Sequence, residues 1–130
     1  MPSFLSSAVG SAARFSLVKV ADGAVVVPDL TVAIDSASRR KGLLGREGLP
    51  EESGLIIAPS NAVHTFFMRF PIDIVFLTRD GEVLSVRSSV GPWRMAASFR
   101  GFAVLELAAG RAARCGLTTG ERLRLRALEA

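Results

Sequence analysis

The sequence has very few of the residue types on which many small binding proteins and enzymes depend. It contains one cysteine, Cys115, together with one tryptophan, one histidine and no tyrosine. A single cysteine excludes an intramolecular disulfide and a zinc site built from several thiolates. The shortage of Trp and Tyr argues against an aromatic-rich surface for stacking single-stranded nucleic acid.

Long apolar runs are also missing from the sequence. No stretch approaches the ~20 apolar residues that a membrane-spanning helix needs. The N-terminus has no basic segment followed by an uninterrupted apolar core, which a secretory signal would require. We therefore expect a cytoplasmic protein without a transmembrane segment.

What remains is the composition of one ordinary globular domain. The 130 residues are 49% hydrophobic and 22% charged, enough to bury a sizeable core. Sixteen basic and twelve acidic residues leave a net charge of +4, and the densest basic cluster is Arg39-Arg40-Lys41. This mild excess does not predict nucleic-acid binding. We expect residues 15–130 to form a single β-rich domain, preceded by a loosely ordered, Ser/Ala-rich extension over residues 1–14.

Short alternating or apolar runs, separated by turn residues, predict a mainly-β fold. Strands are expected over residues 15–20, 25–27, 30–34, 55–58, 72–77, 83–86, 102–107 and 123–128. A helix is expected from Asp35 or Ser36 to about Gly45, and a turn or short helix over residues 109–115. About eight short strands with one or two short helices predict a compact small barrel or sandwich, with α+β at the margin of the assignment.

Three charged residues interrupt apolar runs and need an explanation. Asp73 lies in the run Ile72–Leu77, which reads as a strand covered on both faces, and Glu106 interrupts a second such run. Arg46 follows Leu43-Leu44-Gly45. An ionisable group in such surroundings costs several kcal/mol unless it is paired, hydrogen-bonded or neutralised. The three residues are therefore expected to find partners.

Together with His64, the only histidine, these residues are the candidate site. In one interpretation Arg46 and His64 face a ligand while Asp73 and Glu106 orient them. The guanidinium of Arg46 would then bind a carboxylate or phosphate group through two parallel hydrogen bonds. The other interpretation is a buried ion and hydrogen-bond cluster that only stabilises the fold.

We expect a non-enzymatic or accessory binding domain whose polar pocket takes a small anionic ligand. One alternative is a hydrolase with His64 as general base, which requires His64 at the bottom of a cleft within reach of Asp73 or Glu106. Another is a surface module that contacts protein or nucleic acid through Trp93 and the arginine-bearing last strand. No spacing matches a metal or cofactor motif, so neither is expected.

Four motifs also occur in an order found in a known family. They are Arg40–Arg46, Gly54-Leu55-Ile56, His64–Leu77 and Leu105–Gly110. Over about residues 30–126 the chain resembles the bacterial and archaeal family DUF192, a domain of unknown function. The resemblance implies a compact mainly-β domain and assigns no catalytic residues. Arg46, Met68, Asp73 and Glu106 stand at motif positions.

The chain departs from many members of that family in two respects. Many carry Trp-Met-Lys-Asn-Thr where this sequence has Phe67-Met68-Arg69-Phe70-Pro71. Many also begin with a signal or lipoprotein leader, which this chain is expected to lack.

Overall fold

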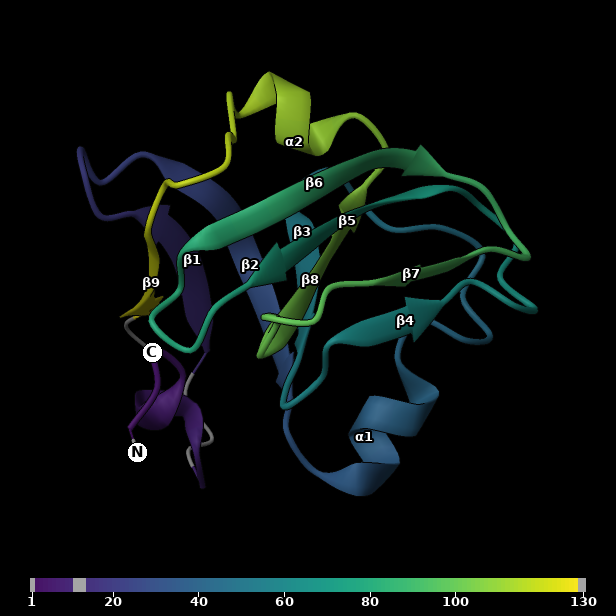
Figure 1. Ribbon diagram of the computed structural model, residues 1–130, viewed down its shortest axis with the longest axis horizontal. Coiled ribbons are helices and arrows are strands. Elements are labelled where there is room, and N and C mark those ends of the chain that lie inside the picture. Colours follow the sequence, from purple (N-terminus) through teal and green to yellow (C-terminus); the bar gives the residue numbers. More distant parts are fainter. Residues whose placement is uncertain (1, 11–13, 129–130) are drawn as a thin grey trace.

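The computed structural model describes residues 2–10 and 14–128, and it is built around one curled sheet (Figure 1). In chain order the elements are the 3₁₀ turn η1 (Ser6–Ala8), β1 (Phe15–Lys19), β2 (Val25–Ala33), α1 (Ser36–Lys41), β3 (Ser53–Ile57), β4 (Ala62–His64), β5 (Ile72–Leu77), β6 (Val83–Val90), β7 (Met95–Ala97), β8 (Ala103–Ala108), α2 (Arg111–Arg114) and β9 (Leu123–Ala127). The predicted mainly-β class is confirmed.

Seven strands form the main sheet in the order β6-β5-β8-β3-β2-β1-β9. All neighbours are antiparallel except β2 and β3, which are parallel. A bridge between Glu82 and Arg122 joins the two edge strands at one end, so the sheet curls into a half-barrel. Gly81 lies at this corner with φ of 85°, and a Cβ there would come within 2.4 Å of the Leu123 carbonyl oxygen. Only glycine fits such a close approach.

The sheet carries a hydrophobic core on each face. On the inner face, side chains from β1 and β9 reach those of β5 and β6 across the curl. This inner core includes Leu17, Ile56, Val75, Leu77, Leu105, Leu107 and Leu123. The outer core lies over β3, β5 and β8 and includes Leu55, Ile57, Ile72, Ile74, Phe76 and Val104. Burial on both faces explains why every residue of β5 except Asp73 is apolar.

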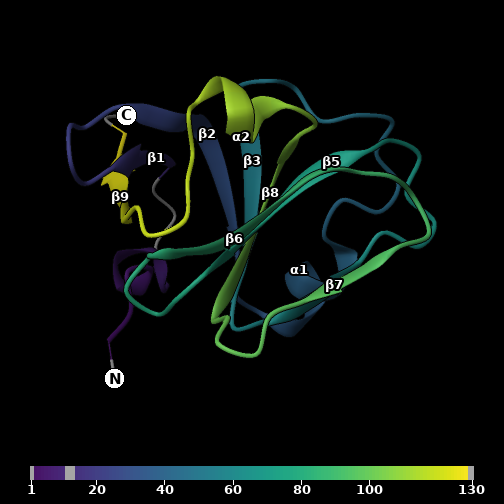
Figure 2. The same cartoon turned by 45° about the horizontal axis from the view of Figure 1, so that its top comes forward.

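The two faces are covered by different elements. Ala112 of α2 packs into the inner core, whereas the loop after α1 and the two-stranded β4–β7 ribbon pack against the outer core. Figure 2 shows α1 and this ribbon together, well away from α2. The outer face is therefore where short elements from separate parts of the chain meet.

Two strand and helix boundaries differ from the sequence prediction. The expected strands 25–27 and 30–34 are one strand, β2, that continues through Pro28. The β1–β2 register shifts at this point, so the missing N–H of proline breaks no regular ladder. The helix expected to reach Gly45 ends at Lys41, because Gly42 has φ of 45° and cannot continue it.

The segment between the expected strands 83–86 and 102–107 contains more strand than predicted. This segment contains the end of β6 and all of β7. In the extension, Leu5 is 1% exposed within the inner core, and the Phe4 N–H donates to the Arg79 carbonyl at 2.9 Å. Leu5 and this hydrogen bond therefore connect the first residues of the extension to the domain. Residues 11–13 of the expected extension lie outside the described residues.

Candidate functional site

Asp73 on β5 is completely buried and has a full set of partners. Its Oδ1 accepts hydrogen bonds from the backbone N–H groups of Ser89 at 2.8 Å and Gly110 at 3.0 Å. Its Oδ2 accepts from the N–H of Ala112 at 2.9 Å. These bonds tie the end of β6 and the start of α2 to the middle of the sheet. Asp73 thus satisfies donors that would otherwise be buried without partners.

Glu106 on β8 is also buried, at 2% exposure, but it faces the other side of the sheet. The register places Asp73 opposite Leu107 of the inner core, and Glu106 opposite Ile74 and Leu55 of the outer core. No hydrogen bond or ion pair to the Glu106 carboxyl occurs among residues 2–10 and 14–128. Burial raises the pKa of Glu106 to about 7, and the charge of Arg46 acts weakly against this rise.

Glu106 forms part of the wall of a pocket of about 460 Å³ on the outer face. The other walls come from α1 and the turn after it, the end of β3, the β4 strand and the segment that follows it. Polar lining residues are Ser36, Arg39, Arg40, Lys41, Ser60, His64 and Glu106. Leu43, Ile57, Val63 and Met68 supply apolar surface. The pocket therefore combines a buried carboxyl with three cationic side chains.

Arg39 is the most firmly placed of these cations. Its Nη1 donates to the Pro59 carbonyl at 3.2 Å, and its Nη2 contacts the Ser36 hydroxyl at 3.4 Å. Its Nε is fully enclosed and has no hydrogen-bond partner among the described residues. A buried N–H without an acceptor is costly, so this atom is an exception to the hydrogen bonding usual for buried polar groups.

The start of α1 is set by its N-cap, Asp35, the residue before the helix. The Ser38 N–H and hydroxyl donate to the Asp35 carboxylate at 2.8 and 2.7 Å. These bonds hold the pKa of Asp35 below its usual value. Together with the end of the helix at Gly42, the cap sets which short stretch of sequence presents its basic residues to the pocket.

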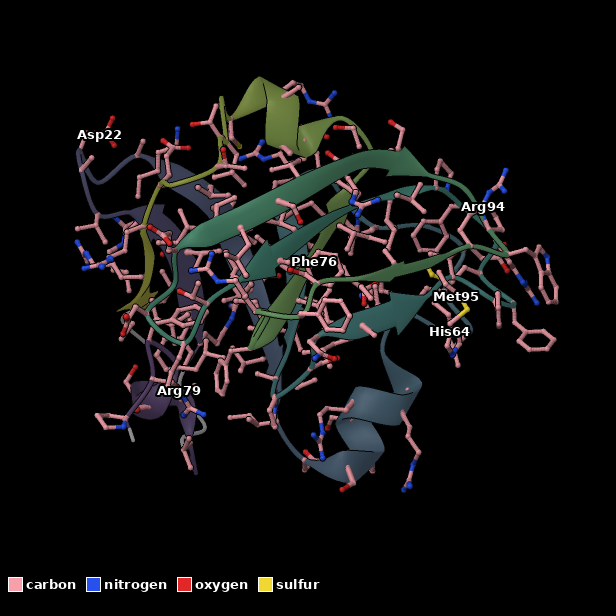
Figure 3. The ribbon with its side chains drawn as sticks, in the orientation of Figure 1. Asp22, His64, Phe76, Arg79, Arg94 and Met95 are labelled. Carbon is pink, nitrogen blue, oxygen red and sulfur yellow. The ribbon has the colours of Figure 1, made fainter. Side chains whose placement is uncertain are left out.

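His64 lies on the exposed rim of the pocket, at the end of β4. Its Nδ1 accepts the Phe66 N–H at 3.2 Å, and its ring stacks on Phe66 with centroids 4.8 Å apart. Figure 3 shows it beside Met95, its cross-strand neighbour on β7. Within the described ranges no carboxylate bonds to the His64 ring. The hydrolase alternative requires His64 at the bottom of a cleft beside an acid. In the structure His64 is exposed and its ring contacts Phe66.

The four predicted site residues are therefore only partly brought together. Glu106 and His64 line one pocket, and Arg46 is exposed outside the lining but near enough to influence Glu106. Arg46 forms no ion pair with either buried acid in the described ranges. Asp73 lies on the opposite face, so His64, Asp73 and Glu106 do not converge as metal ligands would.

The basic residues of α1 were not among the predicted site residues. Arg39, Arg40 and Lys41 form the densest basic cluster in the sequence, on a helix that the capping pattern had already indicated. That cluster was the available signal. What the sequence did not provide was the packing of α1 beside β3 and β4, which are more than ten residues further along the chain.

The half-barrel with an outer-face pocket defines a class of small mainly-β domains. Within this class, the chain belongs to the family DUF192, described as an uncharacterized ACR, whose family model matches residues 17–125. No curated protein matches the chain. The described part of the chain holds no helix of sufficient length and apolarity to cross a membrane.

Two solved structures share the fold. One is a protein of unknown function from Novosphingobium aromaticivorans, with 25% identity and a TM-score of 0.73 over 85% of this chain and 83% of that one. The other is a Sinorhizobium meliloti protein described as a proposed transcription regulator, with 23% identity and a TM-score of 0.75 over 87% of this chain and 92% of that one. At 23% identity, the similarity to the second protein shows a shared fold and nothing about function.

Proposed function

We propose that this protein is a small binding domain whose outer-face pocket takes a small anionic ligand. The observation that carries the proposal is Glu106, a buried carboxyl that faces the pocket and has no partner among the described residues. Buried polar groups in folded proteins are nearly always hydrogen-bonded, and exceptions often mark a site that another molecule completes.

The electrostatics of the pocket favour an anion over a cation. Arg39, Arg40 and Lys41 supply three positive charges around the pocket, and Arg39 has a buried N–H available. With a pKa of about 7, Glu106 is largely neutral below neutrality, and a neutral carboxyl group can donate a hydrogen bond to an anionic oxygen. A carboxylate or phosphate group placed between Arg39 and Glu106 would satisfy both.

The apolar part of the pocket wall indicates what else the ligand contains besides its anionic group. Leu43, Ile57, Val63 and Met68 lie beside the charged groups. A pocket of about 460 Å³ with this mixture suits a small organic acid or phosphate ester that also has an apolar portion. A cytoplasmic location stays a prediction from the sequence.

Thermal unfolding with a panel of anions tests this proposal. The panel contains inorganic phosphate, aliphatic mono- and dicarboxylates and a nucleoside monophosphate, each added to wild type, Arg39→Gln and Arg124→Gln. A ligand at about a hundred times its dissociation constant stabilises by about 2.7 kcal/mol, a shift of several degrees. Arg124 is an exposed arginine on β9, outside the pocket, and serves as the matched control.

The proposal predicts that at least one anion raises the melting temperature of wild type and Arg124→Gln but not of Arg39→Gln. If no member of the panel separates Arg39→Gln from the other two proteins, the pocket is not an anion site. A shift that is lost equally in both variants would indicate only screening of the overall positive charge.

A further inference from the structure

A second feature of the surface lies at the end of β4 and the start of β7. Phe67, Trp93 and Met95 are 70%, 60% and 74% exposed, although all three are large and apolar. We refer to these three residues as the apolar tip. In Figure 3, Arg94, Met95 and His64 lie at the end of the molecule opposite both termini. Three large apolar side chains exposed together are a typical mark of an interaction surface.

The loops that carry the apolar tip are held together by Thr65, which is completely buried. The Thr65 N–H donates to the Arg94 carbonyl at 2.9 Å, and the Arg94 N–H donates to the Thr65 hydroxyl oxygen at 2.9 Å. The Trp93 N–H donates to the Thr65 carbonyl at 3.0 Å, and the Thr65 hydroxyl donates to the Gly91 carbonyl at 2.7 Å. The tip is thus a fixed structure and not a frayed loop.

The backbone of the tip is strained in a way that holds the rings outward. Phe67 and Trp93 have φ of 65° and 66°, the left-handed region that residues with a Cβ rarely adopt. The rings contact each other edge-on with centroids 4.8 Å apart, and Trp93 also stacks on Phe66 at 5.8 Å. Strain at exposed aromatic residues gains no core packing, and such strain concentrates at functional positions.

The surroundings of the tip are positively charged. The two segments that form it, residues 62–70 and 87–97, contain Arg69, Arg87 and Arg94 but no Asp or Glu. Arg69 is paired with Glu47. Arg87 and Arg94 have no ion pair in the described ranges and line a groove of about 550 Å³ between the end of β6 and the start of β7, which Met95 also lines.

From this arrangement we infer that the apolar tip docks on an anionic phospholipid membrane. Phe67, Trp93 and Met95 enter the interface between headgroups and acyl chains, and Arg87 and Arg94 bind headgroup phosphates at the adjoining groove. Aromatic rings are favoured at the membrane interface, and arginines are attracted to anionic lipids within a Debye length. The chain's net charge of +4 acts in the same direction.

Other partners fit these observations less well. A stable protein interface buries about 800 Å² on each side, whereas the tip is three projecting side chains. Single-stranded nucleic acid needs free ring faces on which bases can stack, but Trp93 is already stacked on Phe66. A membrane interface accepts a small projecting group of rings as it stands.

The chain provides its own reporter for this docking. Trp93 is the only tryptophan and there is no tyrosine, so intrinsic fluorescence comes from the tip. Vesicles of phosphatidylserine and phosphatidylcholine in equal parts should shift the emission to shorter wavelength, and brominated acyl chains should quench it. Pure phosphatidylcholine vesicles should do neither, and added salt should reverse the binding.

Variants then separate the roles of the apolar and basic residues. Phe67→Ser combined with Met95→Ser retains Trp93 and should weaken vesicle binding about tenfold or more. Arg87→Gln combined with Arg94→Gln should do the same and should also reduce the salt dependence. The control is Phe99→Ser, an exposed phenylalanine beyond the other end of β7, which should bind as wild type does. Unchanged melting temperatures verify that each variant is folded.

Several results would overturn the inference. They are an absent emission shift with anionic vesicles, an equal shift with neutral vesicles, or equal weakening by Phe99→Ser. An emission shift on raising protein concentration alone would assign the tip to self-association. A shift with a single-stranded oligonucleotide but not with vesicles would assign it to nucleic acid.

Discussion

Two buried carboxyl groups on neighbouring strands of this protein have opposite surroundings. Asp73 on the inner face accepts three backbone N–H groups, whereas Glu106 on the outer face has no partner in the described residues. Each is at most 2% exposed. Burial alone therefore does not distinguish a structural acid from a candidate binding residue, but the number of hydrogen-bond partners does.

The two faces also differ in how they are built. The inner core is closed by the corner at Gly81 and by α2, whose start depends on Asp73. The outer core is covered by short, separate elements, and a pocket remains between them. A face assembled from α1, β4 and their loops leaves room for another molecule, and a face closed on itself does not.

The largest expected effect is at Asp73. The variant Asp73→Asn keeps the shape of the side chain but replaces one acceptor oxygen with an NH₂ group that faces a backbone donor. We expect a loss of about 4 kcal/mol in the free energy of unfolding, measured with urea, because charge-assisted hydrogen bonds are lost and a buried N–H is left without an acceptor. A loss below about 1 kcal/mol would contradict the structural role of Asp73.

At Glu106, replacing the carboxyl group is expected to raise the free energy of unfolding rather than lower it. The pKa of Glu106 is about 7 in the folded protein and 4.5 in the reference state, so the folded state holds its proton more strongly. Its contribution to stability is present below about pH 4.5 and is lost as the pH rises towards 7. The variant Glu106→Gln, which is neutral at every pH, should be more stable than wild type by about 3 kcal/mol at pH 8.

The difference in free energy of unfolding between wild type and Glu106→Gln, measured at each pH, reports the titration of Glu106 separately from that of other acids. Glu51 and Glu121 have lowered pKa values because of the hydrogen bonds from Arg114 and the Thr118 N–H, so they stabilise the fold as pH rises. Subtracting the two urea curves at each pH removes these contributions. Equal stability of wild type and Glu106→Gln across pH 4 to 8 would mean that the Glu106 carboxyl group is solvated or paired in the folded protein.

The smallest effect on stability is expected at Arg39. Because Arg39 is half-exposed and, among residues 2–10 and 14–128, bonds only to Pro59 and Ser36, Arg39→Gln should change the free energy of unfolding by less than about 1 kcal/mol. Binding of an anion identified in the thermal screen should weaken about tenfold or more in isothermal titration calorimetry. A variant that binds as wild type does would place the anion elsewhere.

Part of this comparison could be predicted from the sequence. Apolar runs interrupted by Asp73 and Glu106 predicted two buried acids, and alternating patterns predicted the β-rich class. Trp93, which the surface-module alternative named as a contact residue, is 60% exposed. These features depend on local pattern and on the cost of burying charge, which the sequence displays directly.

The rest depends on pairing over long distances along the chain. Only the β5–β8 register reveals that Asp73 and Glu106 face opposite sides, because a shift of one residue would reverse this result. The partners of Asp73 lie 16, 37 and 39 residues away. Neither the pocket beside α1 nor the joining of two loops by Thr65 leaves a local pattern in the sequence.

The most direct test of the central claim is the titration of Glu106 itself. The ¹³C chemical shift of its side-chain carboxyl group can be followed by NMR from pH 4 to 9 and assigned by its absence in Glu106→Gln. A midpoint near 7 is the result that an unpartnered carboxyl in this pocket predicts. A midpoint at or below 4.5 would show that the group is solvated or paired, and the pocket would lose the feature on which its proposed function depends.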